Sequence, residues 1–200
     1  MLVDQQVAVE RRPDAWFVAA SVTDHATFAV LYDRHATALF RYAYARVGAE
    51  FADDMVSETF LAAFRRRQHY DASRPDARPW LFGILTKEIS HHRRRERAHY
   101  QAMARSYASD RGLDSSEQAV AHAAARAIRA PLAKALATLA ARDRDVLLLI
   151  AWGELSYEET AQAVGIPVGT VRSRLHRARR KVAAALGGED PTRVIEECHE

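Results

Sequence analysis

The chain has 200 residues, of which 48% are hydrophobic, and its formal net charge at pH 7 is +3. This length accommodates one or two small domains, and the apolar content is enough to build real cores, which excludes a wholly disordered chain. The single cysteine, Cys198, excludes an internal disulfide and a cysteine-based zinc site. No apolar run reaches the length of a membrane span, and residues 1–20 lack the basic start and apolar core of a signal peptide. We therefore expect a cytoplasmic protein that does not enter a membrane.

The first half of the chain has the apolar spacing of three packed helices. Apolar residues recur at steps of three and four from Phe28 to Ala43 and again from Val56 to Phe64, with GAEF between the two runs. Turn-forming residues then concentrate in YDASRPDARP, and a third apolar stripe runs from Trp80 to Ile89 into the arginine cluster HHRRRER. The sequence therefore predicts one helical domain at 21–98, preceded by an N-terminal extension at 1–20.

The second half begins with a segment that cannot build a core of its own. Residues 99–130 are rich in alanine and polar residues and contain few large apolar ones, which favours a linker. Pro131 then opens a short helix, which is followed by the strongly apolar run DVLLLIAW. The sequence predicts a second helical domain at 131–187 and an acidic tail at 188–200. The expected fold class is therefore all-α, with two small helical domains joined by a linker.

Within the second domain, the stretch LSYEETAQAVGIPVGTVRSRLHRARRK predicts a helix-turn-helix. Ser156 and Glu159 have the spacing of a capping box, in which each side chain accepts a hydrogen bond from the backbone N–H of the other residue. Gly165 can take the left-handed conformation that ends the first helix, and Pro167 favours a fresh helical start. We therefore expect two consecutive helices joined by a tight turn.

The second helix of this pair carries six Lys or Arg residues within positions 172–181. Val171, Leu175, Ala178 and Val182 fall on one face of the helix, so the cationic side chains point elsewhere. A helix fits the major groove of DNA, where arginine binds guanine through two hydrogen bonds and also neutralises phosphate. A merely solvated arginine-rich face is the competing interpretation. The capping box, glycine turn, apolar stripe and arginine cluster all stand in one register, which favours DNA binding.

These residues carry a resemblance to a known family. The stretch ALATLAARDRDVLLLIAWGELSYEETAQAVGIPVGTVRSRLHRAR resembles the C-terminal promoter-binding domain of extracytoplasmic-function (ECF) sigma factors, the small initiation subunits of bacterial RNA polymerase. In the N-terminal half, FAVLYDRHATALFRYAYARVG, ADDMVSETFLAAFRRR and RPWLFGILTKEISHHRRRER resemble, in order, the family's first helix, its polymerase-docking helix and its helix for the minus-ten element. The resemblance covers Phe28 to Leu186 and leaves the linker unmatched in detail.

The resemblance implies that the chain binds core RNA polymerase through its beta-prime and beta subunits, recognises promoter DNA and assists its melting. Carried over residue by residue, it assigns three surfaces. The expected core-polymerase contacts are Asp53, Asp54, Met55, Glu58 and Leu61. The expected minus-ten contacts are Tyr70, Asp71, Arg74, Lys87, His91, Arg93, Arg94 and Arg97. The expected minus-thirty-five contacts are Thr170, Arg172, Ser173, Arg174, Arg177, Arg179 and Arg180.

Other interpretations stay open for some of these residues. Asp53 and Asp54 also suit the positive end of a helix dipole, and the segment 68–79 also fits an ordinary surface turn. Two positions depart from the family pattern, because Ser57 stands where glutamine is common and Lys87 where asparagine is frequent. The departure at Lys87 leaves the base preference at the minus-ten element open.

Two other functions are compatible with a DNA-binding domain. The acids of the expected docking helix could hold magnesium in a nuclease, although two-metal nucleases gather carboxylates from several elements. The second alternative is a helix-turn-helix regulator that does not join core polymerase. The histidines in and just after the basic cluster lack the helical spacing and the supporting carboxylates of a zinc site: His91, His92 and His99. We expect no catalysis, no metal or other cofactor and no small-molecule substrate, and whether an anti-sigma protein binds the chain is left open.

Overall fold

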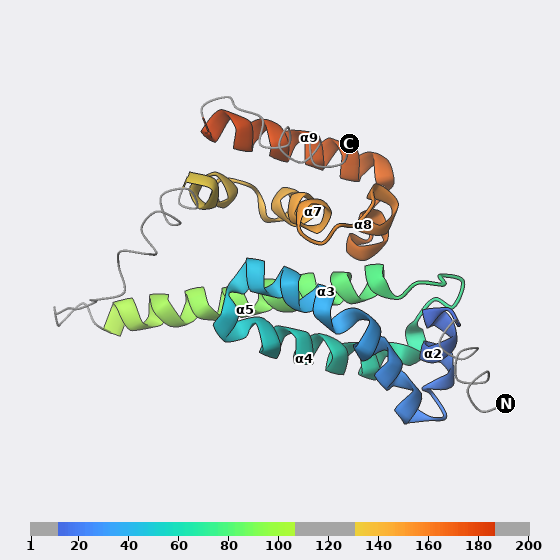
Figure 1. Ribbon diagram of the computed structural model, residues 1–200. Helices are drawn as coiled ribbons and strands as arrows, with labels where there is room; N and C mark the ends of the chain where they lie inside the picture. The colour runs from blue at the N-terminus through green and yellow to red at the C-terminus, as the bar shows by residue number, and fades with distance from the viewer. Residues whose placement is uncertain (1–11, 107–130, 187–200) are drawn as a thin grey trace.

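The computed structural model describes residues 12–106 and 131–186, and the side chains of its longest helix only as far as Arg95 (Figure 1). Every regular element within these residues is helical, so the expected all-α fold class is confirmed. The N-terminal domain consists of α2 (Asp14–Ala20), the 3-10 helix η1 (His25–Phe28), α3 (Ala29–Val47), α4 (Ala49–Arg66), the 3-10 helix η2 (Arg67–His69) and α5 (Arg78–Ser106). The C-terminal domain consists of a helical segment at 131–137, α7 (Ala141–Ala151), α8 (Tyr157–Val164) and α9 (Val168–Ala185). None of these helices is both long enough and apolar enough to cross a membrane.

The N-terminal domain is a bundle in which α3, α4 and α5 bury the apolar stripes that the sequence predicts. Leu39 and Tyr42 of α3 and Leu85 of α5 are completely inaccessible to solvent. The backbone of Gly48, with φ of 86°, lets α4 begin directly after α3 ends. The two helices therefore pack along their lengths and leave the outer face of α4 exposed.

α2 belongs to the same bundle, although residues 1–20 were expected to form an N-terminal extension. Phe17 and Val18 are buried in the N-terminal core, with exposed fractions of 0% and 1%. The backbone N–H of Ala15 donates to the carbonyl oxygen of Pro75 at 3.1 Å, which ties α2 to the loop before α5. The helical domain therefore begins before residue 21, at Asp14.

The C-terminal domain has the predicted helix-turn-helix. The capping box at the start of α8 is confirmed, because the Ser156 hydroxyl accepts from the Glu159 amide and the Glu159 carboxylate accepts from the Ser156 amide. Gly165 has φ of 68° and ψ of 43°, the left-handed conformation that ends α8, and Pro167 is the N-cap of α9. The four predicted apolar positions of α9 are all buried: Val171, Leu175, Ala178 and Val182.

The two domains pack directly against each other, with α7 and α8 lying over α3 and α5 (Figure 1). Leu148, Leu149 and Leu155 are buried in the same apolar cluster as the N-terminal core. Val146 of the same run is buried instead among residues of α8 and α9. The apolar run DVLLLIAW therefore serves two cores, one on each side of α7, and this contact between domains was not predicted from the sequence.

Candidate nucleic-acid and polymerase interfaces

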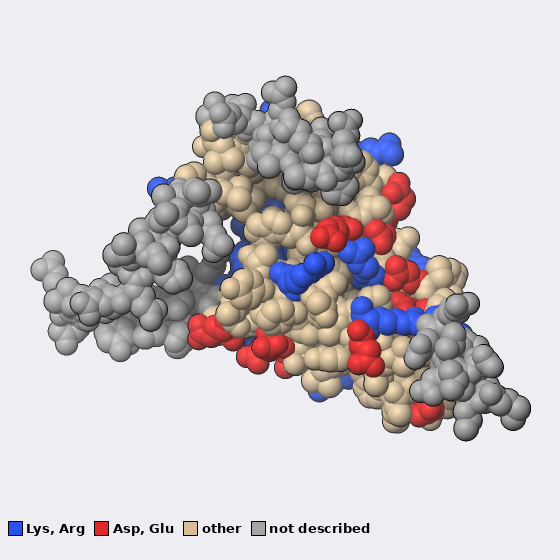
Figure 2. All heavy atoms as spheres, viewed as in Figure 1, with Lys and Arg blue, Asp and Glu red and all other residues tan. Residues whose placement is uncertain are grey.

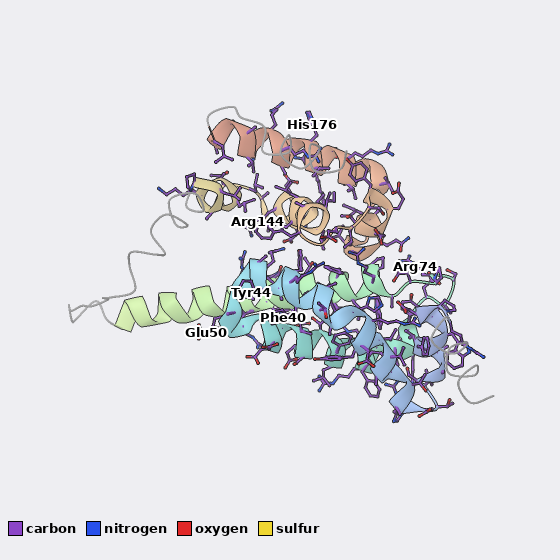
Figure 3. The ribbon with its side chains drawn as sticks, in the orientation of Figure 1. Phe40, Tyr44, Glu50, Arg74, Arg144 and His176 are labelled. Atoms are coloured by element: carbon purple, nitrogen blue, oxygen red, sulfur yellow. The ribbon has the colours of Figure 1, made fainter. Side chains whose placement is uncertain are left out.

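The candidate DNA-reading surface of α9 lies opposite its buried stripe. Arg172 and Ser173 in its first turns are exposed, and Thr170 and Arg174 are partly buried. Arg180, nearer the C-terminal end of the helix, is exposed. Figure 3 shows His176 on the outer side of α9, pointing away from α7. The outer face of α9 is therefore open to a duplex along most of its length.

Two of the predicted DNA contacts on α9 differ from the exposed cations of that helix, because Arg177 is tied to its own domain and Arg179 is partly buried. Arg177 forms a two-bonded fork with Asp143 of α7, in which Nε lies 3.1 Å from Oδ2 and Nη2 lies 3.1 Å from Oδ1. The hydrogen bonds to Asp143 and the charge of that carboxylate raise the pKa of Arg177. Arg179 is partly buried, and its Nε has no hydrogen-bond partner among the described residues. The fork at Arg177 fixes how α9 sits on α7, a role that sequence spacing alone did not indicate.

The loop between η2 and α5 is held by its own polar side chains. The hydroxyl of Tyr70 donates to the carbonyl oxygens of Arg74 and Asp76, at 2.7 and 3.1 Å, and its ring lies 4.9 Å from the ring of Trp80. Burial, followed by the charges of the nearby carboxylates, raises the pKa of Tyr70 to about 12. Asp71 accepts from the backbone and hydroxyl of Ser73 and from Arg74. The three predicted minus-ten residues of this loop therefore form one ordered turn.

Asp14 supports that loop, and this role was not predicted from the sequence. Its carboxylate accepts from Arg34 Nη1 and His35 Nε2, both at 2.6 Å, and from the backbone N–H of Ala77 at 3.0 Å. One ligand atom each of Asp14, His35 and Asp76 lies within 4.8 Å of the others. Both oxygens of Asp14 are already engaged by these donors, so the cluster works as an internal brace. The one feature of the sequence that could have pointed to this brace is the acid directly after Pro13. An acid at that position is equally typical of a helix N-terminus.

The predicted minus-ten cations of α5 do not share one environment. Lys87, His91 and Arg94 are exposed. Arg93 donates instead to the backbone carbonyl oxygen of Arg46 at the end of α3, which satisfies an acceptor at a helix C-terminus. Arg97 lies in α5, but its side chain falls outside the described ones. The exposed cations of α5 are thus available to a nucleic acid, while Arg93 joins two helices.

The predicted polymerase contacts lie on and beside a groove between α4 and α5. The groove has a volume of 530 Å³, and Asp54, Met55 and Glu58 line it from α4. Glu88, His91, His92 and Arg95 line the opposite wall from α5. Asp53 and Leu61 are exposed on α4 outside the groove, and Met55 is 8% exposed at its floor. The structure therefore brings three of the five predicted residues together.

Comparison with known proteins identifies the family. Residues 31–99 match the family Sigma-70 region 2, and residues 129–182 match Sigma-70 region 4. The ECF RNA polymerase sigma factor SigL of Mycobacterium tuberculosis (strain ATCC 25618 / H37Rv) is 34% identical over 169 residues, which cover 84% of this chain and 93% of SigL. The chain belongs to the ECF RNA polymerase sigma factors. The resemblance found in the sequence is thereby confirmed.

Two further relatives fit this assignment to the ECF sigma factors. SigE of Mycolicibacterium smegmatis (strain ATCC 700084 / mc(2)155), also an ECF RNA polymerase sigma factor, is 32% identical over 154 residues. That match covers 76% of this chain and 58% of SigE. The solved structure of CnrH in complex with the cytosolic domain of CnrY is 28% identical, with a TM-score of 0.60, and the match covers 88% of this sigma factor and 98% of CnrH.

Proposed function

We propose that this ECF sigma factor binds core RNA polymerase, directs it to a subset of promoters and assists melting of the DNA there, without catalysing a reaction itself. The observation that carries the proposal is the presence of both sigma regions in one chain, in the order in which region 2 precedes region 4. A helix-turn-helix regulator that does not join polymerase has no reason to carry region 2. The protein acts in the cytoplasm, where core polymerase and the chromosome are.

The C-terminal domain reads the minus-thirty-five element with α9. The first turns of a recognition helix are the part that reaches base edges, so Thr170, Arg172, Ser173 and Arg174 are assigned to base contacts. Arg180 lies further along the exposed face and is assigned to phosphate. Arg177 remains in the interface as a residue whose ion pair with Asp143 helps to set the position of the helix, and Arg179 remains an expected DNA contact.

The N-terminal domain holds the minus-ten element. A base that leaves the stack needs a pocket with polar edges, and the backbone beside it needs cations. The ordered turn at Tyr70, Asp71 and Arg74 supplies polar groups next to the ring of Trp80. The other expected cations of α5, continuing from this turn, are assigned to the backbone of the melted strand: Lys87, His91, Arg94 and Arg97. Arg93, also expected there, donates to the carbonyl oxygen of Arg46 and is assigned to joining α5 with α3.

The groove between α4 and α5 is assigned to the beta-prime subunit of core polymerase. Asp54 and Glu58 supply negative charge at its edge, and Met55 supplies apolar surface at its floor. Asp53 and Leu61 extend the contact along the exposed side of α4. The beta subunit is a further expected partner of the bound sigma factor, without a residue assignment.

Run-off transcription tests the proposal. Core polymerase is incubated with promoters selected from the host genome, with and without this protein, and transcripts are resolved by length. We expect transcripts of defined start only when the protein is present. Binding to promoter duplexes without co-purification with core polymerase, and without any transcript, would favour the regulator instead.

A further inference from the structure

The groove between α4 and α5 has an acidic wall and a wall that carries two histidines. All the described residues that line it come from these two helices. Six of them bear an ionisable group: Asp54, Glu58, Glu88, His91, His92 and Arg95. With both imidazoles neutral, three carboxylates against one guanidinium leave the groove with a net charge of −2, and with both imidazoles protonated the net charge is zero. The charge of the groove therefore depends on its histidines.

The two histidines share one face of α5 with the other charged residues of that wall. The members of this face stand three or four positions apart, so they are neighbours on the helix surface: Glu88, His91, His92 and Arg95. His91 is exposed, and His92 is partly buried, with its ring centre 4.5 Å from that of Phe51 in α4. A ligand that lies between the two walls is therefore close both to the imidazoles and to the acids of α4.

The outer side of α4 makes the same part of the molecule more negative. Glu50 and Asp53 are exposed there, outside the groove. Figure 2 shows acidic side chains along the edge of the molecule that the first half of α4 forms. Electrostatic complementarity favours a partner of the opposite charge. The occupant that fits this surface is a cationic protein segment, which in the proposed function belongs to the beta-prime subunit of core polymerase.

Protonation of the imidazoles opposes such a partner in two ways. Histidine is the side chain that ordinarily changes its charge between about pH 5 and about pH 8. A protonated His91 or His92 repels a cation that enters the groove. The protonated ring also competes with that cation for the carboxylates of Asp54 and Glu58. Both effects have the same sign, so the affinity of the groove for a cationic segment falls as the pH falls.

We propose that the groove is a pH-sensitive docking site, in which neutral His91 and His92 admit a cationic segment of core polymerase and protonated His91 and His92 oppose it. This inference rests on the proposed function, because that function assigns the groove to polymerase. It adds a regulation of that site by pH. Docking is strongest above about pH 7 and weakens as the pH falls toward about 5.5.

The test measures the affinity of the full-length protein for core polymerase at two pH values. The protein carries a fluorophore at Cys198, its single cysteine, and binding is followed by fluorescence anisotropy at equal ionic strength. No DNA is present, because His91 is also assigned to the melted strand. We expect the parent to bind about fivefold more weakly at about pH 6 than at about pH 8, since added positive charge in the groove acts against docking.

Variants at the histidines separate this effect from other groups that titrate in the same range. Glutamine cannot take up a proton, so His91→Gln should reduce the pH dependence, and adding His92→Gln should remove most of it. His91→Arg carries a fixed positive charge and should bind weakly at both pH values. His176→Gln is the matched control, because His176 lies on the outer side of α9, and it should keep the parent profile.

Circular dichroism at both pH values establishes that each variant is folded. His91 is exposed, so His91→Gln and His91→Arg decide the question even if the double variant loses helical content. A pH profile that is the same in the parent and in the folded histidine variants overturns the proposal, while the polymerase assignment of the groove stands. If the parent does not bind core polymerase at either pH, the proposed function itself is wrong, and the pH-sensitive docking is refuted with it.

Discussion

Asp14→Asn is expected to destabilise the N-terminal domain and to loosen the loop assigned to minus-ten DNA. Asparagine has the shape of aspartate, but it is neutral and places an amide nitrogen against groups that are themselves donors. Removing one partner of a buried charged pair costs about 3–5 kcal/mol of unfolding free energy. The Arg34 side chain is 27% exposed, so solvent screens part of the interaction. We therefore expect the free energy of unfolding to fall by about 2–3 kcal/mol, at or below the lower end of that range.

The effect of this substitution depends on pH with a definite sign. Burial alone would raise the pKa of Asp14, but hydrogen bonds from His35, Arg34 and the Ala77 amide, with the charge of His35, outweigh burial and lower it well below 3.8. A pKa lower in the folded than in the unfolded state stabilises the fold above the unfolded value, and this contribution is lost as pH falls toward the folded value. The difference between parent and variant should therefore be larger at about pH 5 than at about pH 3.

Urea unfolding followed by circular dichroism at both pH values measures the difference in unfolding free energy. The fluorescence anisotropy of a labelled single-stranded oligonucleotide shows whether the loop between η2 and α5 still binds DNA. Asp33→Asn is the matched control, because Asp33 is an exposed acid on the neighbouring helix α3 and its replacement should change stability by less than about 0.5 kcal/mol. If Asp14→Asn unfolds at the same urea concentration as this control, the brace does not contribute to stability. A difference that grows on acidification would refute the sign of the pKa argument.

Two further predictions concern the proposed interfaces. Arg174→Ala should cost about 1–3 kcal/mol on the preferred minus-thirty-five duplex and much less on a scrambled one, whereas Arg180→Ala should weaken both alike and reduce the salt slope by about one. Equal losses on both duplexes for both variants would leave α9 as a purely electrostatic contact. Charge reversal at Asp54 and Glu58 should weaken co-purification with core polymerase at unchanged helical content, whereas reversal at Glu50, outside the groove, should not. If the variant reversed at Asp54 and Glu58 co-purifies as well as the parent, the groove is not part of the docking site.

The features predicted correctly from the sequence are those fixed by residues close together in the chain. The capping box needs only Ser156 and Glu159, and the left-handed turn needs only Gly165, so local spacing was sufficient. The buried stripe of α9 follows from helical periodicity. The family could be inferred because these local signals stand in a fixed order along most of the chain.

The features that were missed depend on partners far apart in the chain. Arg177 looks like any other exposed cation of α9 until Asp143, 34 positions earlier, is brought beside it. α2 has only seven residues, too few to show a helical period, and its membership of the core depends on contacts with α3 and the loop before α5. Asp14 was missed for the same reason, because its three donors lie 20 to 63 positions away.

The contact between the two domains left a signal in the sequence that local reasoning did not use. A small helix-turn-helix domain needs one apolar face on α7, and Val146 supplies it toward α8 and α9. Leu148 and Leu149 lie outside that face of α7. In an isolated domain they would form an exposed apolar patch together with Leu155. An apolar run on both faces of a short helix therefore indicates a second partner, which here is the N-terminal domain. Because separating the two domains would expose this apolar surface to water, any partner that separates them must offset that cost with contacts that exist only when the domains are apart.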